Sequence, residues 1–362
     1  MFQEIVAGLE AGSGYSLLGL AIVVIMKSTD VPNFAMGEMG LVAAYLTWYL
    51  WEEPSKGGEG WPFGWAVLVG IIFGALFGAL IQYLLIRPLT GLSNVPLAIA
   101  GAAFMLWQSI TFVENEGLPS FFDWFPVADE GFHIAIAILF GLITTVGVFF
   151  ALRKWVKPLA RVDHFPLLLL TIGLNFVLQA AIELIWGATP RGFRAPWSGD
   201  NVLIGDTRVG WDQIITIAAG LVIAFGVGGF FRTKWGTRMR AIAEDGTTAR
   251  MLGINAGWVS VSAWALGGLI AGIAMTLHTS STILQLGSAE GLILKGFIAA
   301  VLGGFVSLPG TFIGGLVIGV GEAVAGAQID TSVQPTVALL AVVLVLLIKP
   351  GGFTTQAKLR EV

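Results

Sequence analysis

The sequence contains no cysteine, and charged residues make up only 12% of its 362 residues. The absence of cysteine excludes disulfides and thiolate metal sites. The shortage of charge excludes an ordinary water-soluble fold, because a soluble domain is about a quarter charged. A net charge of −4 gives no indication of a nucleic-acid partner. Hydrophobic residues make up 56% of the chain, so the lipid bilayer is the expected solvent.

The chain also lacks the residue clusters of an enzyme. Its three histidines are not spaced as metal ligands are: His133, His164 and His278. The phosphate-binding pattern G-x-x-x-x-G-K-[S/T] is absent, so the chain is not expected to hydrolyse ATP. We therefore expect no metal, no cofactor and no catalytic site in this chain.

Long hydrophobic runs take up most of the sequence. A membrane-spanning helix needs about 20 mostly apolar residues, and about eleven stretches approach that length: 5–26, 34–51, 64–86, 94–113, 133–152, 165–187, 211–231, 256–277, 291–306, 309–327 and 334–349. They predict an all-α fold, a polytopic membrane helix bundle that forms one domain over residues 1–362. The ninth and tenth stretches are short and joined by the turn signal Ser307-Leu-Pro-Gly310, so they could instead be a re-entrant pair.

The positions of lysine and arginine predict the orientation of the bundle. The first basic residue is Lys27, so the N-terminal stretch is read as a retained span rather than a signal peptide. With the N-terminus outside and the C-terminus cytoplasmic, 14 of the 19 Lys and Arg residues fall in inner segments and 4 in outer ones. The outer loops would then be 52–63, 114–132 and 188–210.

One stretch of the chain is similar to another. Arg87-Pro-Leu and Lys157-Pro-Leu lie 70 residues apart, and each follows one apolar run and precedes another. Residues 64–113 and 134–183 could therefore be duplicated helical hairpins. Chance similarity between apolar helices explains the pattern equally well, and both interpretations stay open.

Glycine is abundant, with 49 residues, and recurs every fourth residue in three stretches: Gly70–Gly74–Gly78, Gly268–Gly272 and Gly315–Gly319. Small residues at this spacing are typical of transmembrane helices that pack closely. We expect these glycines to lie at helix contacts and to have no role in binding a solute.

One concentrated polar helix interrupts the apolar runs. Residues 238–252 read as a short amphipathic helix within an inner loop at 232–255, and Gly253 is a C-terminal stop signal. Asp245-Gly246 is a weak point at which a turn could divide it. The helix could lie on the lipid surface or dock a cytoplasmic protein. Two acids, Glu244 and Asp245, among small residues favour docking, because a lipid-surface helix carries Lys and Arg along its polar face.

The same segment, Ala241-Ile-Ala-Glu-Asp245 followed by Ala249-Arg-Met-Leu-Gly-Ile-Asn255, resembles the coupling loop of branched-chain amino acid ABC transporter permeases. Further pieces of that family's pattern follow one another in the same order along the chain: Gly12–Leu17, Asn33–Glu38, Arg87–Leu89, Lys295–Gly304, Ser307–Gly315 and Glu322-Ala323. Each piece is weak alone, but together they cover nearly the whole chain.

The resemblance implies the membrane half of an importer. The implied partners are a second permease, usually a paralogue, two cytoplasmic ATPase subunits that bind ATP and Mg²⁺, and an extracytoplasmic substrate-binding protein. The coupling loop would dock into the ATPase with residues that include Arg240, Ala243, Glu244, Asp245, Ala249, Leu252 and Gly253. This chain departs from the family in two ways: Met36 stands where histidine is common, and the chain is longer by about one hairpin.

Two polar stretches are candidates for the translocation path. Asn33, Phe34, Gly37 and Glu38 follow a proline, and they could form either a plain helix start or an interrupted helix whose free N–H groups meet a carboxylate. Asn175 and Gln179 share a helix face that Glu183 extends. That face could border the path or bond neighbouring helices.

Charged residues inside spans are costly in lipid and are usually paired. Lys295 and Glu322 are placed at similar depths below the outer boundary on adjacent predicted spans. We expect them to form an intramembrane ion pair, which favours a role in helix packing over direct contact with a solute.

These observations predict the translocation subunit of an ATP-driven importer in the cell membrane, for branched-chain amino acids or related small polar solutes such as amides and urea. The alternative is a self-sufficient secondary transporter or channel. That alternative needs a buried coupling-ion site, and it gives no reason for an acidic helix on the cytoplasmic face.

Overall fold

The computed structural model describes residues 1–29, 32–86, 165–205, 207–305 and 307–348. The predicted spans at 94–113 and 133–152, and with them most of the proposed duplication, lie outside the described residues. The chain divides into two compact units. The first holds Met1–Pro32, Met36–Gln82 and the chain from Ala188 onward, and the second holds Asn33–Ala35 and Tyr83–Gly187.

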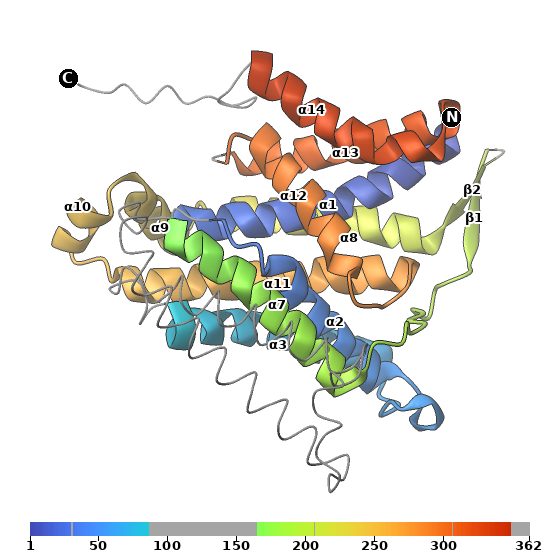
Figure 1. Ribbon diagram of the computed structural model, residues 1–362, viewed down its shortest axis with the longest axis horizontal. Coiled ribbons are helices and arrows are strands. Elements are labelled where there is room, and N and C mark those ends of the chain that lie inside the picture. The colour runs from blue at the N-terminus through green and yellow to red at the C-terminus, as the bar shows by residue number, and fades with distance from the viewer. Residues whose placement is uncertain (30–31, 87–164, 206, 306, 349–362) are drawn as a thin grey trace, which may run out of the picture. The chain divides into compact units, whose positions relative to one another are not determined.

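Helices form nearly all of the described chain (Figure 1). The first unit contains α1 (Phe2–Thr29), α2 (Met36–Trp51), α3 (Phe63–Ile81), α8 (Trp211–Phe230), α9 (Lys234–Glu244), α10 (Gly246–Met251), α11 (Ala256–Ser281), α12 (Ser288–Leu302), α13 (Leu308–Gln328) and α14 (Gln334–Ile348). Short 3-10 turns cover Pro54–Lys56 and Thr331–Val333, and a π-helical turn, Gln82–Ile86, extends α3. The second unit contains α7 (Phe165–Trp186).

Six helices of the described chain are long and apolar enough to cross a membrane: α1, α3 with its π-helical extension, α7, α8, α11 and α13. Their bounds lie within a few residues of the predicted spans, since each apolar run is long enough to specify a helix by itself. A multi-span helical membrane protein is therefore confirmed. The total of about eleven spans and the sides of the two termini stay predictions.

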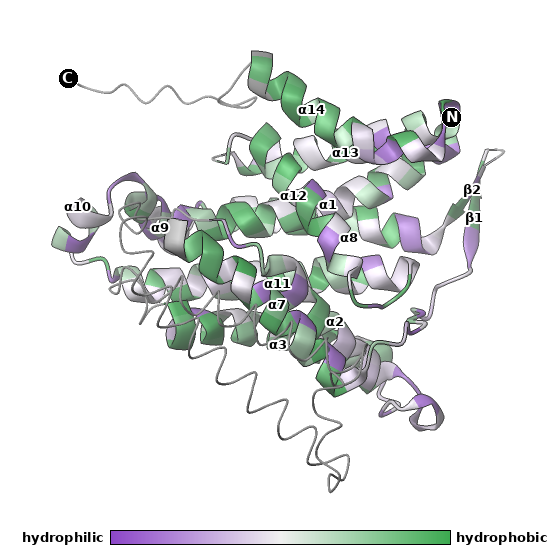
Figure 2. Ribbon diagram, viewed as in Figure 1, coloured by the Kyte–Doolittle hydropathy of each residue, from purple (hydrophilic) through white to green (hydrophobic). Residues whose placement is uncertain are grey.

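The all-α prediction missed one element. Strands β1 (Asn201–Ile204) and β2 (Thr207–Gly210) form an antiparallel hairpin inside the predicted outer loop at 188–210. Gly205, with φ of +63°, occupies the turn. The hairpin and the N-terminus lie at one end of the first unit, and α9 and α10 lie at the opposite end (Figure 1). Hydrophilic residues gather in the segment from α9 to α10, whereas α3 and α14 are mostly hydrophobic (Figure 2).

Helix α1 is the centre of the first unit. Every residue from Gly12 to Ile25 is buried, because α13, α11, α12 and α8 pack around it. By contrast, α8 leaves Val222 and Phe225 exposed, as expected for a helix that faces lipid. The core of this unit is therefore a central helix that is buried on all sides over Gly12–Ile25, with α8 at its periphery.

Glycines set how closely these helices approach. A methyl group at Gly8 would lie 2.6 Å from Val320 Cα, and one at Gly12 would lie 2.8 Å from the Gly315 carbonyl oxygen, so α1 and α13 meet backbone to backbone. A methyl group at Gly74 would lie 2.8 Å from the Gly268 oxygen, which joins α3 to α11 in the same way. The predicted role of the glycine repeats in helix packing is confirmed.

Replacing Gly12 with alanine should separate α1 from α13 and lower the free energy of unfolding by about 1–3 kcal/mol, the usual cost of overpacking. The matched control is Gly226→Ala on α8, where an added methyl group meets nothing within 4 Å. That variant should be neutral or slightly stabilising, because alanine favours helix over glycine. Thermal unfolding in detergent measures both, and equal midpoints for the two variants would contradict the packing role.

Candidate functional site

The predicted polar helix is two helices in the structure. Thr233 begins α9, and its hydroxyl accepts the Gly236 N–H at 3.4 Å. Helix α9 ends at Glu244, Asp245 is extended with φ −154° and ψ 99°, and α10 starts at Gly246. The division falls at the weak point that the sequence indicated, because aspartate favours a helix N-cap over a helix interior.

Asp245 caps α10 with its own carboxylate. The carboxylate accepts the N–H groups of Thr247 at 2.8 Å and Thr248 at 3.1 Å, and also the hydroxyl of Thr248. These bonds, that of the Thr248 hydroxyl above all, hold the pKa of Asp245 below its usual value. Asp245 is therefore a helix cap as well as a predicted docking residue, and a change at this position would not test docking alone.

Because the folded pKa of Asp245 is lowered, its capping contribution is present above the unfolded pKa and is lost as pH falls through the folded pKa. Hydrogen-exchange protection of the Thr247 and Thr248 amides should therefore decrease at acidic pH. In Asp245→Asn the side chain still accepts hydrogen bonds but does not titrate, so protection should be independent of pH. The same acid-dependent loss in both proteins would exclude Asp245 as the cause.

The solvent-exposed surface of the α9–α10 segment has one acidic residue and, at the end of α10, two apolar residues. Glu244 is exposed, and Met251 and Leu252 are 81% and 76% exposed. The other predicted coupling residues differ in exposure: Arg240 and Gly253 are exposed, Ala243 is half-buried, and Ala249 is only 2% exposed. Ala249 therefore packs inward, whereas Glu244, Met251 and Leu252 form a surface, which we call the coupling knob.

The coupling knob is attached to the C-terminal end of α1. Met239 and Ile242 of α9 are buried, and α9 packs against α1 and α11. Near the end of α1, the Lys27 ammonium lies 5.8 Å from the centre of the Phe231 ring, and Gly236 packs on the Phe231 backbone. A force applied to the knob would therefore reach the central helix of the first unit.

In the second unit, the two predicted path stretches meet. The Asn175 amide donates to the Phe34 carbonyl oxygen at 3.5 Å, and the Phe34 N–H donates to the Thr171 hydroxyl at 3.4 Å. The Ala35 N–H donates to the Asn33 side chain at 2.9 Å. The N–H groups of Phe34 and Ala35 thus have side-chain partners, which argues against the expectation that they are free for a carboxylate. Thr171, missed earlier, extends the Asn175–Gln179 stripe by one turn toward the start of α7.

In the first unit, Glu38 lies in the first turn of α2. Its neighbour Gly37 packs against Ala289 and Ile293 of α12. The Glu38 side chain is fully buried, and within the described ranges neither carboxylate oxygen has a hydrogen-bond partner. Buried polar groups normally find partners, so Glu38 is the most unusual of the predicted path residues.

The structure brings Lys295 and Glu322 together with a third residue. Lys295 Nζ lies 2.8 Å from Glu322 Oε2 and 3.0 Å from the Tyr15 hydroxyl oxygen, and the Tyr15 hydroxyl donates to Glu322 Oε2 at 2.9 Å. These residues belong to α12, α13 and α1, and Glu322 is only 4% exposed. The triad joins three helices, as expected of a group with a packing role. Tyr15 gave no signal in the sequence, because nothing local marks a tyrosine as the partner of a carboxylate 307 residues away.

Among the described residues, no group of three or more His, Cys, Asp and Glu side chains could hold a metal ion. The groups that the structure brings together are an exposed acidic and apolar surface, hydrogen-bonded backbone and a buried ion pair.

Comparison with known proteins assigns the chain to a family. The family model described as "Branched-chain amino acid transport system / permease component" matches residues 92–348. The high-affinity branched-chain amino acid transport system permease protein BraD of Pseudomonas aeruginosa is 24% identical over 99% of this chain and 97% of its own length. The corresponding LivH protein of Salmonella typhimurium is 32% identical over 57% of this chain and 69% of its own.

A further relative is named for the import of a different solute. The autoinducer 2 import system permease protein LsrC of Yersinia enterocolitica is 28% identical over 59% of this chain and 56% of its own length. No solved structure matches the chain. These relatives are named as membrane permeases of transport systems, in agreement with the apolar helices seen here. The chain is a membrane protein that belongs to the family of permease components of branched-chain amino acid transport systems.

Proposed function

We propose that this chain is the translocation subunit of an ATP-driven importer. The observation that carries the proposal is the coupling knob: exposed Glu244 ends α9, exposed Met251 and Leu252 end α10, and α9 packs against α1. Such a surface suits a groove on a cytoplasmic protein, because an exposed apolar tip beside a charge is typical of docking sites.

The proposed solutes are branched-chain amino acids, which the names of BraD and LivH give for those proteins. Small amides and urea are the related solutes that a path for small polar molecules would also suit. The proposed partners are two cytoplasmic ATPase subunits that bind ATP and Mg²⁺, a second permease, and an extracytoplasmic substrate-binding protein. This chain itself contributes no nucleotide site, since it lacks the P-loop pattern.

The alternative, a self-sufficient secondary transporter or channel, has one observation in its favour. Glu38 is a buried carboxylate without a hydrogen-bond partner among the described residues, and a buried acid is what a coupling ion requires. The alternative leaves the coupling knob without a role. It also separates this chain from relatives that are named as parts of transport systems.

Reconstitution in lipid vesicles tests the proposal. Uptake of labelled L-leucine is expected only when the chain is combined with its ATPase subunits, second permease and binding protein. It should also require ATP on the side of the membrane where the ATPase subunits lie. Unlabelled valine, isoleucine, acetamide and urea as competitors define the range of solutes. Uptake by the chain alone, driven by a proton or sodium gradient, would overturn the proposal and support the alternative.

A further inference from the structure

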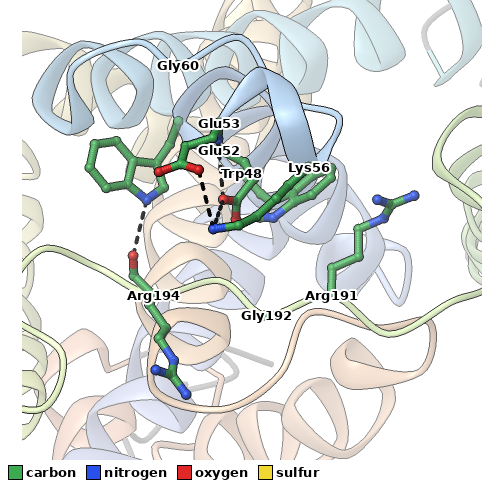
Figure 3. Close-up of a pocket in the computed structure, with 9 residues that line it drawn as sticks. Trp48, Glu52, Glu53, Lys56, Gly60, Arg191, Gly192 and Arg194 are labelled. Carbon is green, nitrogen blue, oxygen red and sulfur yellow. Dashed lines mark hydrogen bonds and ion pairs between the residues drawn. The ribbon is translucent and has the colours of Figure 1, made fainter.

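A cavity of about 670 Å³ lies at the C-terminal end of α2 in the first unit (Figure 3). The chain segments that line it are the end of α2, the Pro54–Lys56 turn and residues 191–194. The residues that bear on its chemistry are Trp48, Trp51, Glu52, Glu53, Lys56 and Arg191. This volume lies within the range of small-molecule sites, about 300–1,000 Å³.

Arg191 is held in this cavity by its backbone. Its N–H donates to the Leu284 carbonyl oxygen at 2.8 Å, and the Leu284 N–H donates back to the Arg191 oxygen at 3.1 Å. Leu284 is fully buried in the connection between α11 and α12. The arginine is therefore fixed to the bundle even though it belongs to a long loop.

The Arg191 side chain stacks on an aromatic ring. Its guanidinium carbon lies 4.5 Å from the centre of the Trp48 ring. Stacking uses the face of a guanidinium, whereas hydrogen bonds to a carboxylate are made in its plane, so one arginine can do both at once. Trp48 itself is buried, and its Nε1–H has no hydrogen-bond partner among the described residues.

Acids of opposite charge stand across the cavity from Arg191 (Figure 3). The Glu52 side chain is only 15% exposed, and Lys56 Nζ lies 3.4 Å from Glu52 Oε1 and 3.6 Å from Glu53 Oε2. Lys56 is 63% exposed, and exposed pairs of this kind are weak. Lys56 therefore occupies a place that another ammonium group could take.

An aromatic cluster holds Trp51 in place in the cavity wall. The Trp51 ring N–H donates to the Arg194 carbonyl oxygen at 3.1 Å. Phe63, at the start of α3, packs edge-on against Trp51 at 5.3 Å and against Trp197 at 5.0 Å between ring centres. The cavity is thus preorganised: its wall holds the Arg191 guanidinium, the carboxylates of Glu52 and Glu53, and two tryptophans, Trp48 and Trp51.

We propose that this cavity binds an α-amino acid in its zwitterionic form, with the carboxylate on Arg191 and the ammonium group on Glu52. The apolar side chain of the amino acid lies against Trp48 and Trp51. The inference deepens the proposed function, on which it rests, by giving the permease a solute site of its own, separate from that of an external binding protein.

Equilibrium binding of labelled L-leucine and labelled L-alanine to the full-length chain in lipid nanodiscs, with no other subunit present, tests the site. Unlabelled L-leucine should compete, whereas 3-methylbutylamine, which lacks the carboxylate, and 4-methylpentanoate, which lacks the ammonium group, should compete roughly tenfold or more weakly. The proposal would be overturned if either analogue competed as strongly as L-leucine, or if neither labelled amino acid bound.

Variants test which side chain binds the carboxylate and which binds the ammonium group of the amino acid. Arg191→Gln and Glu52→Gln should each weaken binding roughly tenfold or more. Lys56→Met should tighten it roughly two- to fivefold, because it removes the competing ammonium. The matched controls are Arg208→Gln, an exposed residue of β2, and Glu59→Gln; neither residue lines the cavity. Tighter binding by Lys56→Met cannot arise from misfolding, so this variant still tests the proposal if Arg191→Gln is unstable. Unchanged affinity in Glu52→Gln or Lys56→Met would contradict the proposal.

The outcomes separate this inference from the proposed function. If the isolated chain binds no amino acid but the complete system still shows ATP-driven uptake, the cavity is rejected as a binding site and the importer proposal is retained. Binding to the isolated chain, with no ATP-driven uptake in the complete system, would reject the importer and leave the cavity standing.

Discussion

Replacing Leu252 with aspartate, or Glu244 with lysine, is expected to abolish ATP-driven uptake while leaving the permease folded. Both side chains are exposed, so the fold should tolerate the changes. A docking surface loses affinity steeply when a central apolar or charged residue is changed, by about 2 kcal/mol or roughly 30-fold. Copurification of the ATPase subunits and uptake in vesicles measure the two effects.

The controls follow from the structure of the same region. Leu203→Asp changes an equally exposed leucine on the β1–β2 hairpin, at the other end of the first unit, and should leave copurification of the ATPase unchanged (Figure 1). Asp245 is avoided because its carboxylate caps α10, and its loss would alter the knob as a whole. Normal copurification and uptake in both Leu252→Asp and Glu244→Lys would reject the docking role.

Breaking the triad of Tyr15, Lys295 and Glu322 is expected to have the largest effect on stability. Lys295→Met leaves the Glu322 carboxylate buried and unpaired, which costs about 3–5 kcal/mol. Glu322→Leu should cost less, because the Lys295 side chain is 25% exposed and can reach toward water. Unfolding in denaturant, followed by tryptophan fluorescence, gives the order of the two variants.

Two double variants show whether the residues act together. Lys295→Met with Glu322→Leu removes both charges and should recover most of the stability, because a well-packed apolar pair can replace a buried ion pair. The exchange Lys295→Glu with Glu322→Lys should recover part of it, because the Tyr15 hydroxyl can donate to one position and accept from the other. Double variants as unstable as the sum of the single ones would mean that the residues act separately.

The coupling knob and the cavity beside Arg191 have different proposed roles in transport. The knob is attached to the C-terminal end of α1, and the triad attaches the same helix to α12 and α13. The Leu284 bridge fixes Arg191 of the cavity to the chain just before α12. The elements that would meet the ATPase and the solute are therefore connected through packed helices of one unit.

The sequence by itself determined the membrane environment, the approximate bounds of the described helices, the glycine contacts and the weak point at Asp245-Gly246. Each of these depends on composition or on spacing within one helix, and a run of apolar residues specifies a helix in lipid whatever surrounds it. The pairing of Lys295 with Glu322 was also within reach, because buried charges need partners and the described spans offered few.

Only the tertiary structure decided which side chains meet across helices. Tyr15 in the triad, Thr171 and Asn175 on the Phe34 backbone, and Arg191 on Trp48 all join residues more than 100 positions apart. Such contacts depend on the rotation of each helix about its axis and on where a loop returns to the bundle. These are set by packing as a whole, so no local pattern in the sequence encodes them.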